Sequence, residues 1–293
     1  VTFFLTPFGL HVLGGTRYGA WSLLIGLTGY YGLLDLGFRA GLTQYLARYL
    51  ATGDFEKVNK TASTGFVALV VVGFGLALVT LVLTIAVPRV FQFQEEGIRE
   101  LRWAILIVGL GVAFQFPFFV FSAALTAVQR YEVSNAIAIT NRLIVAGITV
   151  ILLNCGYGLV GISLATLFGN LVDYVLRWRA AYHFLPKLTI SPWSANWVSC
   201  REFMQFGLWN VLISGSRRII DYSGAVIIGL FLPTAAIAPY ALATSLVSYF
   251  DKIVTPAAQV FFPLATQLDA AGDTQRLQKL YLAGSRMLFC LAI

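Results

Sequence analysis

Several charged side chains of this 293-residue chain lie within long apolar segments. A charge at the centre of a bilayer costs about 2.5 to 3.5 kcal/mol even on permissive insertion scales, so charges in such segments are candidates for function. Guanidinium groups match phosphate oxygens in bidentate fashion, which indicates a site for an anionic group. The predicted cavity-lining residues are Arg39, Arg142, Asn210, Arg217, Arg218, Lys252 and Gln259.

Aspartates within the same segments are candidates for coupling transport to a proton or a sodium ion. They are Asp35, Asp173, Asp221 and Asp251. A buried carboxylate with a raised pKa is a common coupling device. Each of these aspartates also has a cation nearby in the sequence, which would stabilise its charged form. Intrahelical ion pairs, such as Asp35 with Arg39 and Arg217 or Arg218 with Asp221, are therefore the alternative interpretation.

The spacing of these residues places them in stripes along helical faces. The stripes are Asp35, Arg39 and Thr43; Asn210, Ser214, Arg217 and Asp221; Asp251, Thr255 and Gln259; and Asn170, Asp173 and Arg177. Arg177 lies near the end of its segment, where a long side chain can also extend to the membrane surface. Gln115, just before Pro117, is a weaker candidate.

The composition requires that lipid surround the elements that position these residues. The chain is 58% hydrophobic and 11% charged, more apolar surface than a soluble core can bury. Its net charge of +7 does not indicate nucleic-acid binding, because the lysines and arginines are scattered among helix ends and interiors. The three cysteines and two histidines have no spacing typical of a metal site, and we expect neither a metal nor a cofactor.

The apolar pattern predicts an all-α membrane protein with eight or nine spanning segments in this chain. A long segment from Tyr18 to about Leu50 follows a tight turn at Gly14 and is expected to bend near Asp35. Small residues such as Gly26, Gly29 and Gly32 are expected to serve helix packing there. Further spans are predicted at about 62–87, 103–128, 134–153, 159–176, 203–232, 235–264 and from 280 onward.

These spans predict a first six-helix lobe at 1–181, a linker at 182–200 and part of a second lobe at 201–293. The sequence Gly53-Asp54 with Lys57 recurs as Gly272-Asp273 with Arg276, which indicates two related halves. Lysines and arginines are concentrated on the loops that carry these Gly-Asp pairs and on the linker, which predicts that this side is cytoplasmic. Because the chain begins and ends inside apolar runs, we expect a piece of a longer protein.

Several of these features together resemble the polysaccharide flippases, a Wzx-like branch of the superfamily that includes the multidrug and toxin extrusion transporters. They are Tyr18-Gly19-Ala20-Trp21, Leu34-Asp35-Leu36-Gly37, Arg39, Gly53-Asp54 with Lys57, and Asp221 before an Ile-Gly-Leu-Phe run. The resemblance implies a two-lobe bundle of about 12 to 14 transmembrane helices in the full protein, with about nine present here. It also implies a multi-pass protein of a prokaryotic cell membrane.

The resemblance implies that the protein flips a lipid-linked oligosaccharide of the undecaprenyl pyrophosphate type to the external leaflet by alternating access. The alternative is a cation-coupled multidrug exporter, which would use an acidic cavity. The interior charges predicted here are mostly cationic and favour an anionic substrate. A membrane-embedded sugar polymerase or glycosyltransferase is the third possibility, although the longest polar connection, 182–200, carries no carboxylate, no Asp-X-Asp motif and no histidine cluster.

Overall fold

A computed structural model describes residues 2–35, 37–91, 95–251 and 273–292. The described residues form helices joined by short connections and contain no strand, which confirms the all-α prediction. They group into two compact units, Val1–Ala238 and Pro239–Ile293. This grouping does not test the predicted division of the transmembrane bundle into two lobes at 182–200, which stays a prediction.

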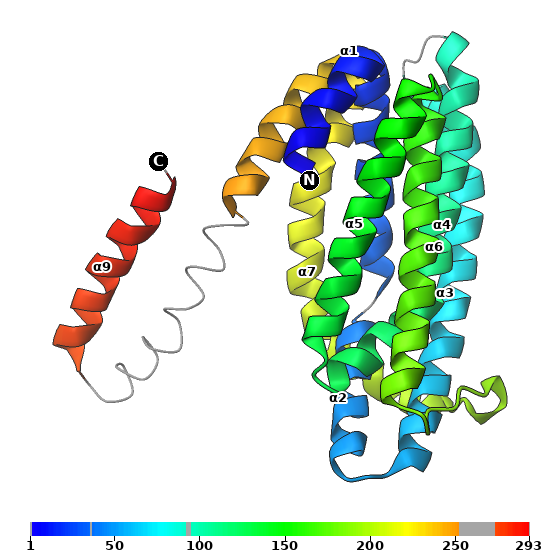
Figure 1. The fold of residues 1–293 in the computed structure, drawn as a ribbon, viewed down its shortest axis with the longest axis vertical. Coiled ribbons are helices and arrows are strands. Elements are labelled where there is room, and N and C mark those ends of the chain that lie inside the picture. Colours follow the sequence, from blue (N-terminus) through cyan, green and yellow to red (C-terminus); the bar gives the residue numbers. More distant parts are fainter. Residues whose placement is uncertain (1, 36, 92–94, 252–272, 293) are drawn as a thin grey trace. The chain divides into compact units, whose positions relative to one another are not determined.

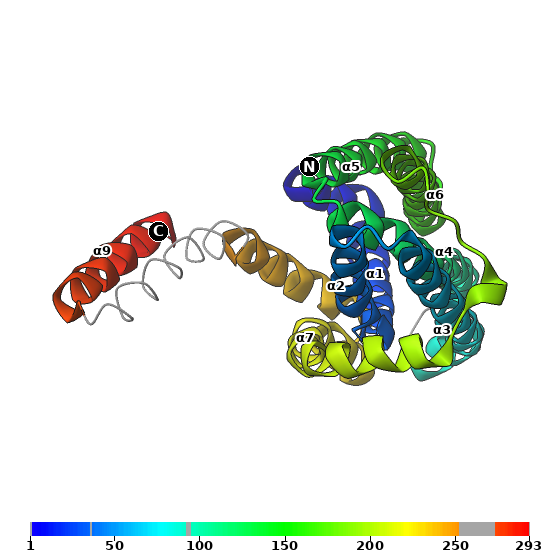
Figure 2. The ribbon, with the colours of Figure 1, turned by 90° about the horizontal axis from the view of Figure 1, so that it is seen from below.

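The first unit is a bundle of long helices (Figures 1 and 2). Its elements are α1 (Thr2–Gly29), the 3-10 helix η1 (Tyr30–Asp35), α2 (Phe38–Ala51), α3 (Phe55–Val90), α4 (Glu95–Ala127), α5 (Tyr131–Asn154), α6 (Gly158–Phe184), the 3-10 helix η2 (Pro192–Ser194), α7 (Trp197–Phe231) and the 3-10 helix η3 (Thr234–Ala236). Among the described residues, four helices are long and apolar enough to cross a membrane, namely α3, α4 from Gly97 onward, α5 and α6.

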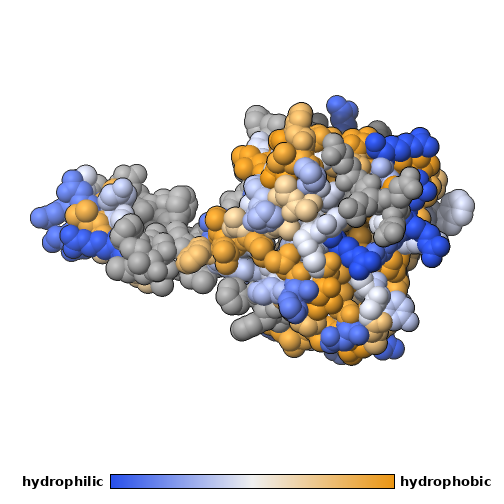
Figure 3. Space-filling model, turned by 90° about the horizontal axis from the view of Figure 1, so that it is seen from above, coloured by the Kyte–Doolittle hydropathy of each residue, from blue (hydrophilic) through white to orange (hydrophobic). Residues whose placement is uncertain are grey.

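Apolar side chains cover the outside of these helices, as expected for a bundle that lies in lipid. Val71, Phe74 and Val82 of α3 are each about two-thirds exposed. Figure 3 shows hydrophobic residues over much of the face in view. The exposed apolar residues are therefore the lipid-facing surface of a multi-pass membrane protein.

The buried core lies where α3, α4 and α2 meet. Leu42, Leu69 and Leu76 are fully buried, and Phe116 is almost so. Gly73 permits a close approach of α3 to α4, because an added Cβ would lie 2.7 Å from the backbone oxygen of Ala113. This packing fixes the helices that carry one wall of the cavity described below.

The chain is interrupted twice before α3. Gly14 has φ of 74° and ψ of 169° inside α1, so the predicted turn at this position is a sharp kink between two helical segments. The expected bend near Asp35 is confirmed, since η1 follows α1 and Gly37 adopts the left-handed conformation before α2 begins.

This interruption corrects one prediction. Asp35 lies in η1 and Arg39 in α2, so Asp35, Arg39 and Thr43 do not form a stripe on a single continuous helix. The reason is the left-handed backbone of Gly37, which ends helical periodicity between them.

The loop between α6 and α7 is fastened to α3 by hydrogen bonds. The side chain of Asn59 donates to the carbonyl of Lys187 and accepts from the N–H of Thr189. Ser63 and Thr64 accept from the N–H groups of residues 191 and 196. The segment predicted as a linker therefore lies along the start of α3.

The second unit contains helical residues 239–251 and α9 (Thr274–Ala292). Asp273 accepts a hydrogen bond from the N–H of Arg276 at 3.0 Å and pairs with its side chain at 3.3 Å. In the first unit, Asp54 caps α3 in the same way, with 3.1 Å to the N–H and 2.8 Å to the Nζ of Lys57. The repeat seen in the sequence is thus also a repeat of local structure.

Candidate substrate cavity

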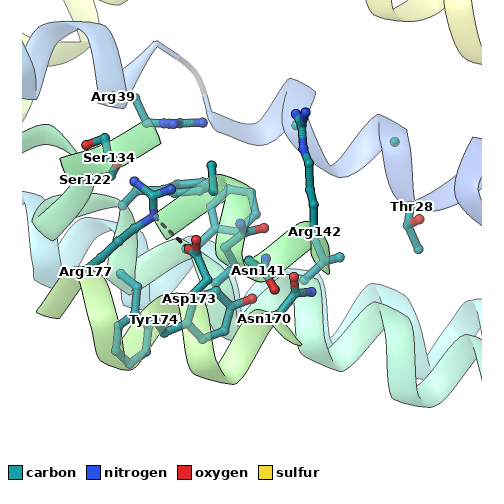
Figure 4. Close-up of a pocket in the computed structure, with 18 of the residues that line it drawn as sticks. Thr28, Arg39, Ser122, Ser134, Asn141, Arg142, Asn170, Asp173, Tyr174 and Arg177 are labelled. Carbon is teal, nitrogen blue, oxygen red and sulfur yellow. Dashed lines mark hydrogen bonds and ion pairs between the residues drawn. The ribbon is translucent and has the colours of Figure 1, made fainter. Parts of the chain in front are cut away.

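A cavity of about 560 Å³ lies within the first unit and is lined by residues from α1, η1, α2, α4, α5, α6 and α7. The charged residues of its lining are Arg39, Arg142, Arg177, Arg218 and Asp173. Four guanidinium groups thus face one carboxylate, which gives the lining a net positive charge. Figure 4 shows how the side chains from separate helices converge on this space.

Asp173 and Arg177 form an ion pair one turn apart on α6. The Nε of Arg177 lies 2.7 Å from Oδ2 of Asp173, and both side chains are largely buried. Within this pair the carboxylate already has a cationic partner. The intrahelical pairing that was the alternative interpretation for the aspartates is therefore present here, inside the cavity lining.

Aromatic rings from α4 and α6 form another part of the lining. The guanidinium of Arg39 lies 4.2 Å from the centre of the Phe119 ring. The rings of Phe118 and Tyr174 are stacked, with centroids 5.0 Å apart. The Tyr174 hydroxyl donates to the carbonyl of Gly111, which holds this ring in place.

Arg218 reaches the cavity from α7. Its Nη1 donates to the carbonyl oxygen of Gly29, the last residue of α1, at 3.3 Å. An added Cβ at Gly32 would overlap the Arg218 guanidinium. The expectation that glycines in this segment permit close packing is met at this position, where the neighbour is a charged side chain.

Amide and aliphatic hydroxyl side chains from α1, α4, α5 and α6 complete the lining. They are Thr28, Gln115, Ser122, Ser134, Asn135, Asn141 and Asn170. Among the described residues, Ser134 Oγ and Asn141 Oδ1 are buried and have no hydrogen-bond partner. A buried polar atom without a partner costs about 1 to 3 kcal/mol, so these two atoms make this wall locally unfavourable.

The structure brings together Arg39, Arg142, Arg218 and Asp173 from the predicted set, along with Gln115. The remaining predicted residues divide into three groups. Asp221 is exposed and is not part of the lining, and Asp251 is an exposed residue of the second unit. The side chains of Asp35, Asn210 and Arg217, and all of Lys252 and Gln259, lie outside the described residues.

Arg177 was predicted to share a helical stripe with Asn170 and Asp173, with an extension to the membrane surface as the alternative, and the structure places it in the lining beside Asp173. Apart from Arg142, sequence reasoning missed the polar face of α5, although Ser134 and Asn141 lie seven residues, or two helical turns, apart. That spacing is a signal that could have identified the face. No cluster of three or more potential metal ligands occurs in the part of the chain that the structure describes.

A family model described as "Polysaccharide biosynthesis protein" matches residues 16–293. The chain belongs to this family. No curated protein matches the chain. A solved structure described as the inward-facing conformation of a multidrug resistance MATE family transporter of the MOP superfamily has the same fold, with a TM-score of 0.73 at 17% sequence identity.

The match to that transporter covers 97% of this polysaccharide biosynthesis protein and 66% of the transporter chain. The family match confirms the resemblance to a polysaccharide biosynthesis family, and the shared fold is the one expected from that resemblance. This member of the family is therefore an all-helical, multi-pass membrane protein with a transporter fold. At 17% identity, the comparison with that transporter shows only that the two chains share a fold.

Proposed function

We propose that this polysaccharide biosynthesis protein flips a lipid-linked oligosaccharide from the cytoplasmic to the external leaflet of a prokaryotic cell membrane by alternating access. The observation that carries the proposal is the charge of the cavity, where arginines from α2, α5, α6 and α7 face one aspartate. A membrane-embedded cavity whose lining carries more guanidinium groups than carboxylates favours an anionic ligand over a cationic one.

A diphosphate that links a lipid to a saccharide suits this arrangement. Arg39, Arg142 and Arg218 come from three different helices, so their guanidinium groups can approach a polyvalent anion from several sides. Hydrogen bonds between guanidinium groups and phosphate oxygens are charge-assisted and roughly twice as strong as neutral ones. The substrate class that the proposal names is therefore a lipid diphosphate saccharide of the undecaprenyl pyrophosphate type.

The uncharged part of the lining suits the saccharide. Amides such as Asn141 and Asn170 both donate and accept hydrogen bonds, as sugar hydroxyls do. The partly buried Phe118 ring, stacked on the buried ring of Tyr174, offers an apolar surface beside them. The cavity volume of about 560 Å³ lies within the range of about 300 to 1,000 Å³ that is common for small-molecule sites. The lipid chain would remain in the bilayer, against the apolar outer surface.

Export of cationic drugs is the alternative with the same fold. A lining with four arginines would repel a cationic substrate, so the cavity favours the saccharide. Asp173 remains the candidate for proton or sodium coupling that lies in the cavity. Its ion pair with Arg177 means that an ion would have to compete with a guanidinium already in place.

The test uses the full-length protein reconstituted into vesicles that contain a fluorescent lipid diphosphate saccharide. A membrane-impermeant quencher reports the fraction of substrate in the outer leaflet over time. Arg39→Gln, Arg142→Gln and Arg218→Gln are each expected to slow flipping about tenfold or more, the usual effect of losing a hydrogen bond to a charged group.

Arg89→Gln is the matched control, because Arg89 is an exposed arginine of α3 that does not line the cavity. It is expected to leave the rate unchanged. Wild-type rates in a variant that lacks all three cavity arginines would refute the proposal.

A further inference from the structure

The break between α1 and α2 lies at the wall of the cavity. α1 ends at Gly29, η1 follows, and Gly37 has φ of 72° directly before α2. Gly29 and Gly32 both line the cavity. A 3-10 stretch within a long helical span often marks a hinge, and the left-handed conformation at Gly37 favours glycine. The break and the candidate binding site are therefore contiguous.

α7 fastens the N-terminal side of this break. Arg218 donates to the carbonyl of Gly29 at 3.3 Å, and the hydroxyl of Tyr30 lies 2.8 Å from Oγ of Ser223. Because glycine has no side chain, Gly32 leaves space beside it that the Arg218 guanidinium occupies. Arg218 thus connects α7 to the last carbonyl before the helix is interrupted.

The C-terminal side of the break carries Arg39, in the first turn of α2. Its guanidinium lines the same cavity as that of Arg218. The bond from Arg218 to the Gly29 carbonyl is long at 3.3 Å, whereas charge-assisted bonds to an anion are about 2.7 to 2.9 Å. A phosphate oxygen in the cavity would therefore compete successfully with this carbonyl for Arg218.

We propose that the anion subsite of the cavity is split across this break, with Arg39 on one side and Arg218 on the other, and that a bound diphosphate takes Arg218 from the Gly29 carbonyl. The inference rests on the proposed function and adds to it a route from binding to movement. Loss of the Arg218 bond frees the break to bend. Because the diphosphate binds the bent state more tightly, bending and binding favour each other.

The experiment uses the full-length protein in lipid nanodiscs with its native cysteines replaced. Spin labels are attached at Ile25 on α1 and Gln44 on α2, two exposed positions on either side of the break. The probe is inorganic pyrophosphate, whose affinity is measured by titration calorimetry. Double electron–electron resonance measures the distance between the labels, and pyrophosphate is expected to shift its distribution.

Three variants separate the role of Arg218 from a general effect on folding. Arg218→Ala is expected to weaken pyrophosphate binding at least about tenfold and to show, without pyrophosphate, the distribution of the bound protein. Gly32→Ala displaces Arg218 from Gly29 but keeps its charge, so the same shift is expected with binding retained. Gly26→Ala is the control, since its added Cβ would make only ordinary contacts of 3.5 Å or more.

Each result decides between the two proposals. If pyrophosphate binds and leaves the label distance unchanged, the split subsite is refuted while the cationic cavity stands. If Gly32→Ala and Gly26→Ala behave alike, the transfer of Arg218 is refuted in the same way. If the wild-type protein binds no pyrophosphate, the cavity proposal fails and this inference fails with it.

Discussion

The ion pair between Asp173 and Arg177 gives a prediction about stability that follows directly from its geometry. Its atoms are 2.7 Å apart, and the two side chains are only 11% and 16% exposed. Removing one partner of a buried pair typically costs about 3 to 5 kcal/mol, because the other charge is left without compensation. We therefore expect Asp173→Asn and Arg177→Gln each to lower the free energy of unfolding by about 3 kcal/mol, the low end, since the cavity admits some solvent.

The double variant distinguishes the pair from two independent effects. It leaves no unpaired charge, and the net charge of the lining equals that of the wild type. Because an unpaired charge is the source of the cost, we expect the double variant to be at least as stable as either single variant, which corresponds to a coupling of about 3 kcal/mol or more.

The assay is denaturant or thermal unfolding of the full-length protein in one detergent, followed by helical circular dichroism. The wild type, both single variants and the double variant form a complete cycle. If the two single effects add in the double variant to within about 0.5 kcal/mol, the residues do not act as a pair and the reasoning is refuted.

Two further predictions concern α3. Gly73→Ala places a Cβ 2.7 Å from the Ala113 carbonyl oxygen and should destabilise the protein by about 1 to 3 kcal/mol. Gly75→Ala is the control, because open space surrounds Gly75, and it should be neutral or stabilising. Equal unfolding free energies of the two variants would contradict the packing argument. Hydrogen bonds from the Lys57 side chain and backbone hold the pKa of Asp54 below its usual range, so its contribution is present above the ordinary carboxyl pKa and lost as pH falls through the lowered value. The difference in unfolding temperature between wild type and Asp54→Ala should therefore vanish in strong acid, and a difference independent of pH would exclude this role.

The long membrane helices were predictable because apolar length alone determines them. The expected spans at 62–87, 103–128, 134–153 and 159–176 lie within α3 to α6 except for residue 128, which is one past the end of α4, and the helices extend up to eight residues beyond the predicted spans. The bend near Asp35 was also predictable from its glycines. The predicted stripe of Asp35, Arg39 and Thr43 was wrong, because the left-handed conformation of Gly37 changes the direction of the side chains that follow it.

The cavity was predictable in part. Arg39, Arg142 and Arg218 were identified because a charge in an apolar segment is costly wherever it lies. The role of Arg177 could not be settled by the same argument, because a position near a helix end suits both a cavity and the membrane surface. The unpartnered amide of Asn141 depends on what α6 places beside it, which spacing along α5 does not determine.

The hydrogen bonds that hold the loop between α6 and α7 against α3 limit how far this loop can extend before α7. Unfastened and extended, the segment 185–196 could span about 40 Å. Bonded through Asn59, Ser63 and Thr64, it works as a short tether, and the first turn of α7 must move with the start of α3. Any rocking of one half of the protein against the other must then pivot beyond that first turn.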